Sequence, residues 1–272
     1  MEVPERLYGV VDLAPEGSRL AVQVADVNDY IWIYDFRRQE GRKLPTKNAA
    51  GWPVWTPDGE RIVFSSSRDG FGDLYWKPAN MGGEAERLTH MEPGHFPVAY
   101  SWSADGTTLF FWHWGPPAEG GVLWVLHFDD DPPRAERVFE NEYAVWHPAI
   151  SPDGRWLAYV AAGMIQVSPY PKMNRFWLVS FRGGTFPMWH PDGSSIFFLD
   201  PEGRLMEAEA RTDPTFSVGR AQLVLEGPFE SFDIAADGDR FLVVKIDRGE
   251  PITELVVVEN WFEELKRKAP PD

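Results

Sequence analysis

One pattern occurs six times along this chain of 272 residues and constrains its fold more than any other feature. Each copy is an apolar run, a turn of the Pro-Asp-Gly type and a second apolar run. The turns are Leu13-Ala-Pro-Glu-Gly17, Trp55-Thr-Pro-Asp-Gly59, Trp102-Ser-Ala-Asp-Gly106, Ile150-Ser-Pro-Asp-Gly154, Trp189-His-Pro-Asp-Gly193 and Ile234-Ala-Ala-Asp-Gly238. Pro presets φ, Asp bonds the local backbone and Gly accepts positive φ, so each copy predicts a tight turn between two strands.

The repeat length identifies the architecture. A period of about 45 residues with about four short strands is typical of a β-propeller blade. The sequence therefore predicts an all-β fold, a six-bladed β-propeller formed by the single domain 1–272, with blade motifs centred on Gly17, Gly59, Gly106, Gly154, Gly193 and Gly238. In each blade the strands are expected to run A to D from the axis outward, and the Asp-Gly turn connects A to B.

The two ends of the chain have separate expected roles. The last unit has room for three strands, so residues 1–7 are expected to supply its outer strand and close the ring. Residues 260–268 are expected to form a short helix, in which Asn260 caps the N-terminus and Glu263 occupies the capping-box position. A lid over the last blade is favoured over a partner-binding helix for this segment.

Composition restricts the partners. With 26 basic and 42 acidic residues, the net charge is −16, which disfavours nucleic acid because its binding depends on clustered Lys and Arg. The absence of cysteine excludes disulfides and thiolate chemistry. No apolar run is long enough to span a membrane, and there is no basic leader, so a cytoplasmic monomer is the default expectation. A periplasmic location is the alternative if a signal segment was removed.

Common catalytic motifs are missing from the sequence. It contains no Gly-x-Ser-x-Gly elbow, Walker loop, His-Glu-x-x-His or EF-hand string. A site assembled from distant loops remains open. The blade topology predicts that B-to-C and D-to-A connections converge on one face, at the mouth of the channel. The binding candidates there are Trp52, Arg68, His95, His113, Trp114, Glu142, Tyr143, His147, Arg182 and Phe186.

The histidines allow two interpretations. His95, His113 and His147, with Glu142, could ligate a divalent cation. The favoured interpretation is structural, because no close-spaced ligand pair supports a metal. In addition, His147 occupies the position in its repeat that Trp52 and Phe186 occupy in theirs. The loop from His113 to Gly121 carries Trp114 and two prolines. It is either an aromatic anchor for a peptide or a rigid spacer packed on the next blade.

The stretch from Trp55 to Gly70, with Asp73-Leu-Tyr75 and Glu86-Arg-Leu-Thr89, resembles the WD40-like PD40 repeat of TolB-type six-bladed propellers. The end of the chain, from Arg240 to Arg267, is similar to propeller modules downstream of bacterial serine/threonine kinase domains. The resemblance covers nearly the whole chain and implies sensing, scaffolding or protein binding, or a gating domain of a prolyl-oligopeptidase-like hydrolase.

These observations favour a non-catalytic module, more a binding protein than an enzyme, that engages a protein or peptide at the channel face. The excess of acidic over basic residues favours a basic partner, and no cofactor or metal is expected. The alternative is a metal-assisted lyase or hydrolase with a His-lined site at the channel mouth. A module that works only as a fused regulatory domain is a third possibility.

Overall fold

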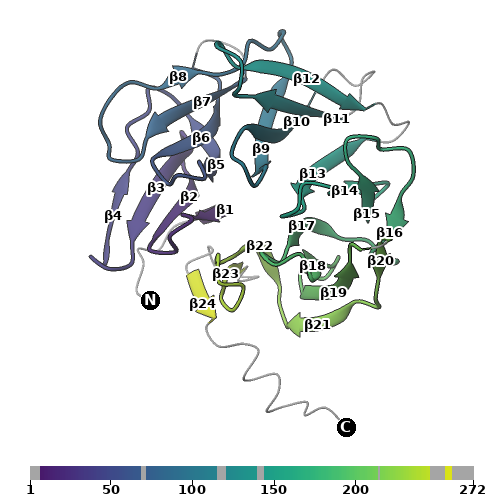
Figure 1. Cartoon of the computed structure of the whole chain (residues 1–272). Coiled ribbons are helices and arrows are strands. Elements are labelled where there is room, and N and C mark those ends of the chain that lie inside the picture. The colour runs from purple at the N-terminus through teal and green to yellow at the C-terminus, as the bar shows by residue number, and fades with distance from the viewer. Residues whose placement is uncertain are drawn as a thin grey trace.

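The computed structural model describes residues 7–68, 72–114, 121–139, 144–213, 215–245 and 255–258; for residues 114, 139 and 255–258 it describes the backbone alone. The described chain is all-β and contains no helix. Its antiparallel sheets stand side by side around a central axis (Figure 1). Among the described residues, no helix has the length and apolar character needed to cross a membrane.

The sheets follow one another along the chain. The first contains β1 (Leu7–Leu13), β2 (Arg19–Ala25), β3 (Tyr30–Asp35) and β4 (Glu40–Lys43). The second contains β5 (Ala50–Trp55), β6 (Arg61–Ser66), β7 (Asp73–Pro78) and β8 (Glu86–Arg87). The third contains β9 (Phe96–Trp102), β10 (Thr108–Trp114), β11 (Gly121–His127) and β12 (Arg134–Phe139).

The second half repeats this plan. The fourth sheet contains β13 (Val145–Ile150), β14 (Trp156–Ala161), β15 (Met164–Pro169) and β16 (Trp177–Leu178). The fifth contains β17 (Thr185–Trp189), β18 (Ser195–Leu199), β19 (Leu205–Arg211), β20 (Ser217–Val218) and β21 (Gln222–Leu225). The last contains β22 (Phe229–Ile234), β23 (Phe241–Lys245) and β24 (Leu255–Val258).

The predicted propeller is confirmed, but six complete blades are not. The described residues form five blades with at least four strands and one further sheet with three. The fourth strand of that sheet was predicted from residues 1–7; residues 1–6 lie outside the described part, and Leu7 belongs to β1, where it pairs with Ala25. The predicted helix 260–268 also lies outside the described residues.

The repeated turns have the predicted geometry. All six motif glycines have positive φ, between +67° and +77°. In each turn the glycine N–H donates to the carbonyl three residues earlier, as Gly154 does to Ser151. Because the turn joins the first and second strands of every sheet, it brings six equivalent turns to one face of the ring.

Apolar side chains fill the seams between sheets. Six clusters of buried residues each span two neighbouring sheets, and the cluster of Tyr8, Val22 and Trp32 includes Leu242 and Val244 of β23. The last sheet therefore packs on the first. The first strands also contact one another around the ring, from β1 to β5, β9, β13, β17 and β22 and back to β1. These innermost strands form the wall of the channel.

Candidate functional site: the central channel

The innermost strands are irregular at equivalent positions. In β5, β13 and β17 the pairing register shifts, and the residues at the shift are Trp52 (φ +56°), His147 (φ +52°) and Phe186 (φ +52°). Each is followed by proline. Bulky residues rarely adopt this left-handed conformation, and a following proline disfavours it further. The fold therefore holds three ring-bearing side chains in place at a conformational cost.

Two of these rings continue into an aromatic arc, defined as Tyr100 of β9, His147 of β13 and Phe186 of β17. His147 stacks on Phe186 with centroids 4.1 Å apart and an interplanar angle of 15°. Tyr100 meets His147 edge to face at 5.0 Å. The arc thus joins three neighbouring sheets and presents ring surfaces to the channel.

Hydrogen bonds fix the orientation of His147. The Phe186 backbone N–H donates to His147 Nδ1 at 3.2 Å, and the Thr185 hydroxyl lies 2.7 Å from the same atom. Since a backbone N–H can only donate, Nδ1 accepts and the ring proton resides on Nε2. Burial lowers the pKa of His147 to about 3, so the imidazole is neutral at physiological pH.

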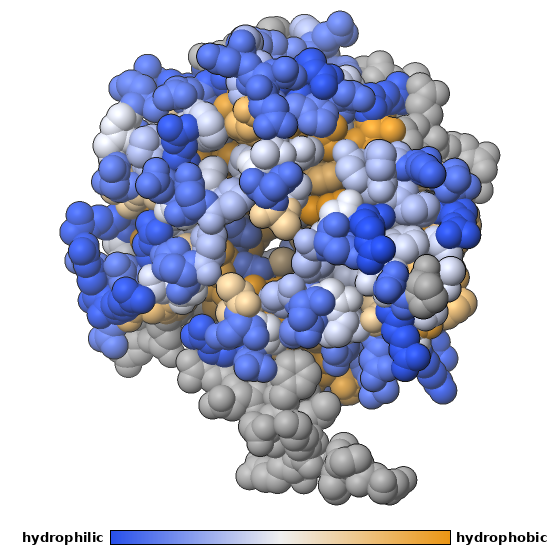
Figure 2. Space-filling model, in the orientation of Figure 1, coloured by the Kyte–Doolittle hydropathy of each residue, from blue (hydrophilic) through white to orange (hydrophobic). Residues whose placement is uncertain are grey.

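The arc lines a cavity of about 360 Å³, here called the channel cavity. Figure 2 shows that the ring is hollowed at its centre. The lining comes from all six innermost strands and includes Val10, Val11, Asp12, Pro53, Val54, Ala99, Tyr100, Ser101, Trp102, His147, Pro148, Ala149, Phe186, Pro187, Met188, Ser231 and Phe232. It also reaches Ala104, Pro152 and Pro191 of the A-to-B turns. The cavity therefore approaches the face opposite the one where the sequence placed the site.

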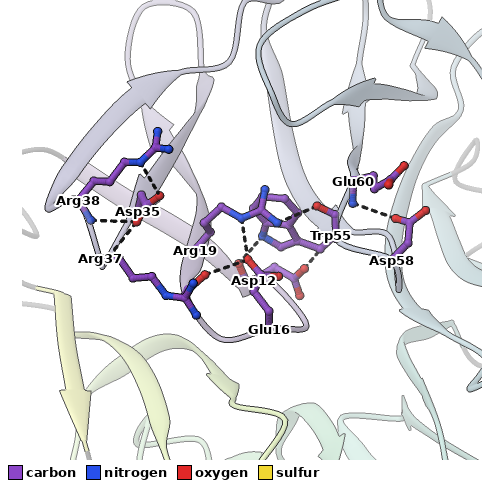
Figure 3. A network of polar contacts seen from close by, with 11 residues as sticks. Asp12, Glu16, Arg19, Asp35, Arg37, Arg38, Trp55, Asp58 and Glu60 are labelled. Carbon is purple, nitrogen blue, oxygen red and sulfur yellow. Dashed lines mark hydrogen bonds and ion pairs between the residues drawn. The ribbon is translucent and has the colours of Figure 1, made fainter.

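Two carboxyl groups occupy the seam that closes the ring. Asp12 of β1 accepts the Trp55 backbone N–H at 2.6 Å, while Asp233 of β22 accepts the N–H of Leu13. Figure 3 shows Asp12 beside Trp55, whose indole N–H donates to the Asp12 carbonyl at 3.1 Å. Each carboxyl thereby ties its own sheet to the next one around the ring.

Both carboxyl groups of this pair have raised pKa values. Burial and repulsion from Asp233 hold the pKa of Asp12 well above its ordinary value, and burial raises the pKa of Asp233 to about 7. Arg19, drawn nearby in Figure 3, is held by Glu16 at 2.6 Å and by the Gly59 carbonyl at 2.8 Å. None of the described residues lining the channel cavity is Lys or Arg.

This pair predicts an unusual dependence of stability on pH. A raised native pKa means that the folded state retains protons that the unfolded state has released, so stability falls as pH rises through the native pKa values. We expect wild-type stability to decrease between about pH 6.5 and about pH 8.5. In Asp12→Asn, the loss of unfolding free energy over this range is expected to be smaller by on the order of 1 kcal/mol. The Asn oxygen can still accept the Trp55 N–H. Thermal melts at both pH values measure this difference.

The pH range and the control isolate the pair. His147 is neutral in the folded state and is present in wild type and in both variants, so its contribution to the stability curve cancels in the comparison. Asp213→Asn removes an exposed carboxyl from outside the cavity lining and is expected to leave the wild-type slope unchanged. An Asp12→Asn curve parallel to that of the wild type would contradict the raised pKa of Asp12.

The structure brings only some of the sequence candidates together. His147 and Phe186 line the channel cavity. Trp52 shares their backbone conformation, and its backbone N–H donates to Gln23 Oε1 at 3.1 Å. Arg68 lies 5.2 Å over the Tyr75 ring, and Arg182 is exposed between β16 and β17. The side chain of Trp114, and Glu142 and Tyr143 entirely, lie outside the described residues.

The other two histidine candidates form a pair in the third sheet. His95 Nδ1 lies 3.2 Å from His113 Nδ1, and the rings are 4.7 Å apart. His113 belongs to β10 and is 1% exposed. Within the described ranges, no group of three His, Asp or Glu residues could hold a metal ion. The pair is thus separate from the set that lines the channel cavity.

Sequence reasoning missed Tyr100, Asp12 and Asp233. Asp12 and Asp233 occupy equivalent positions, the second-last residue of the innermost strand in their sheets. Ser101 occupies this position in the third sheet. There Ser101 accepts the Ile150 N–H at 3.2 Å, as the two aspartates accept from their next sheets. A polar residue at a position that is apolar in the other sheets was the signal that could have identified the two aspartates.

Fold and cavity define a β-propeller with a partly aromatic, partly carboxyl-lined channel. No protein-family model matches the sequence. Among curated proteins, the chain is 27% identical to an uncharacterized protein, Atu1656, of Agrobacterium fabrum, over 58% of this chain and 57% of that protein. It is 31% identical to the uncharacterized peptidase YuxL of Bacillus subtilis, over 35% of this chain and 16% of the peptidase. The matches thus span under two thirds of each relative.

Solved structures show the same fold. A protein assigned as a TolB of Agrobacterium tumefaciens superposes with a TM-score of 0.67 at 18% identity, over 86% of this chain and 87% of the other. TolB from Acinetobacter baumannii gives 0.62 at 16% identity, over 80% and 56%. An oligogalacturonate lyase in complex with manganese gives 0.63 at 15% identity, over 95% and 76%. At these identities the likeness concerns the propeller fold alone, which is TolB-like.

Proposed function

We propose that this chain is a non-catalytic binding module whose channel cavity receives a segment of a protein or peptide. The observation that carries the proposal is the channel wall, where the aromatic arc is held rigidly among apolar residues such as Val54, Pro148 and Met188. Rigid aromatic groups in a concave, mostly apolar site are typical anchors for binding. A TolB-like fold supports a binding role by analogy.

The cavity size suits an extended segment better than a folded domain. About 360 Å³ is within the range of pockets that enclose a small molecule or a few side chains. Unpaired edge atoms of Tyr100 and His147 offer hydrogen bonds to a polar backbone, while the apolar wall receives side chains. The partner is therefore proposed to insert a short stretch of chain at the A-to-B turn face.

Selection and mapping test this proposal together. Random twelve-residue peptides displayed on phage are selected on the immobilised full chain, and the enriched peptides are synthesised with a photo-crosslinker at one end. We expect the peptides to compete for one site and to label β9, β13 and β17. Labelling confined to the loop of Phe181 and Arg182, on the opposite face, or to outer strands, would refute channel binding.

A metal-assisted enzyme is a second proposal, which rests on the His95–His113 contact. It requires further ligands beyond this pair, since His147 Nδ1 already accepts hydrogen bonds in the channel. The test is metal content after loading with divalent ions, compared between wild type and His113→Ala. Equal, negligible metal in both would leave the histidine pair with a structural role.

A further inference from the structure

Three polar atoms face the channel without a partner of their own. The Tyr100 hydroxyl, His147 Nε2 and Asp12 Oδ1 each lack a hydrogen-bond partner among the described residues, although all three side chains line the channel cavity. None of the three is a fully buried atom, so each is open to the channel, where a ligand can hydrogen-bond to it in place of water. One is a donor, one an acceptor and one can do either.

The groups lie on opposite walls. Tyr100, His147 and Phe186 belong to the third, fourth and fifth sheets, whereas Asp12 belongs to the first. Asp12 is level with Ala149 and Met188, two residues beyond His147 and Phe186 along their strands. At about 3.3 Å per residue, and less across the register shift, the two levels are at most about 7 Å apart along the axis. A single side chain of moderate length can therefore span from one level to the other.

Charge selects the kind of side chain. Asp12 and Asp233 repel one another at the seam, and no Lys or Arg lies in the described lining to neutralise them. Burial and this repulsion favour the protonated form of Asp12, and a cation bound there would favour the ionised form. The surrounding Val54, Met188 and Phe232 offer apolar surface to a hydrocarbon stem. The aromatic arc adds ring faces, which attract cations.

We propose that the channel cavity recognises a lysine side chain of the bound peptide, with its ammonium at Asp12 and the peptide backbone at the Tyr100 hydroxyl and His147 Nε2. This rests on the proposed function, since it assigns the residue that the peptide inserts. Lysine fits because its ammonium is compact and carries three donors on a four-carbon apolar stem. The His147 N–H cannot bind a cation and is left to donate to the backbone.

The proposal is tested by the residue preferences of the selected peptides. Phage selection is run in parallel on wild type, on Asp12→Asn and on Asp213→Asn, a charge-matched control outside the cavity lining. Lysine is expected to be enriched at one peptide position with wild type and Asp213→Asn, and not with Asp12→Asn. For a synthetic wild-type-selected peptide, Lys→Gln is expected to raise Kd at least tenfold on wild type and less than threefold on Asp12→Asn.

The failures of the two proposals are distinguishable. Peptides that label β13 and β17 but show no lysine preference, or that prefer arginine equally, would overturn the lysine assignment and leave channel binding intact. The absence of any channel-labelling peptide would overturn both. Thermal melts of Asp12→Asn establish that it is folded, and binding that is lost on adding EDTA would assign the carboxyl to a metal ion instead.

Discussion

Replacing Phe186 by glycine is expected to weaken peptide binding in the channel at least tenfold while the protein stays folded. The ring lines the cavity and stacks on His147 at 4.1 Å, so its removal takes away one third of the aromatic arc. Truncating an aromatic anchor commonly costs more than 1 kcal/mol of binding free energy. Titration of a fluorescent selected peptide into wild type and variant measures the change in Kd.

The same position gives an unusual order of stabilities. Phe186 has φ +52°, a conformation that glycine adopts freely and alanine does not. We therefore expect Phe186→Gly to be more stable than Phe186→Ala by about 1 kcal/mol, the reverse of the order in a regular strand. Urea unfolding of the two variants, which both lack the ring, measures this difference.

Phe181→Ala is the matched control for the binding experiment. Phe181 is 79% exposed in the loop between β16 and β17, near Phe186 in sequence but outside the cavity lining. Its removal is expected to change Kd less than twofold. A larger effect from Phe181→Ala than from Phe186→Gly would move the binding site from the channel to the opposite face.

Replacing Phe197 by alanine is expected to lower the free energy of unfolding by about 3–5 kcal/mol. Phe197 of β18 is 0% exposed and packs edge to face on Phe241 of β23, with centroids 4.9 Å apart. Its removal leaves a cavity in the seam between the fifth and last sheets, which rigid neighbouring strands cannot fill. Urea unfolding followed by tryptophan fluorescence measures the change.

Phe176→Ala provides the comparison for that experiment. Phe176 is 60% exposed, and its truncation is expected to change stability by less than about 0.5 kcal/mol. If Phe197→Ala were equally mild, the seam between the last two sheets would not be packed as described. A lower unfolding midpoint with unchanged slope would confirm that the loss is one of stability alone.

Much of the fold could be predicted because each blade repeats one local signal. The turn at Gly154, like its five equivalents, has the positive φ that its Asp-Gly pattern predicts. The interblade role of tryptophan was also predictable: Trp189 donates its indole N–H to Ala149 of the preceding sheet at 3.0 Å. These features depend on short stretches of chain and therefore appear in the sequence itself.

The site was less predictable because it depends on the register around the ring. The shared repeat position of Trp52, His147 and Phe186 was visible, but not the contact of the His147 ring with Tyr100. That contact requires the bulge in each strand to fall at one height, which sequence spacing alone does not reveal. The Asp12–Asp233 pair joins residues at the two ends of the chain, and only ring closure brings them together.

The three left-handed residues before proline have a consequence for how such a channel can change its partner. Their backbone is set by the bulge and the proline, so the direction of each side chain does not depend on what that side chain is. Tryptophan, histidine and phenylalanine already occupy equivalent positions in three sheets. Exchanging His147 or Phe186, the two that line the channel cavity, would alter the shape and polarity of its wall while the surrounding strands stay as they are, so a new specificity can arise without a new scaffold.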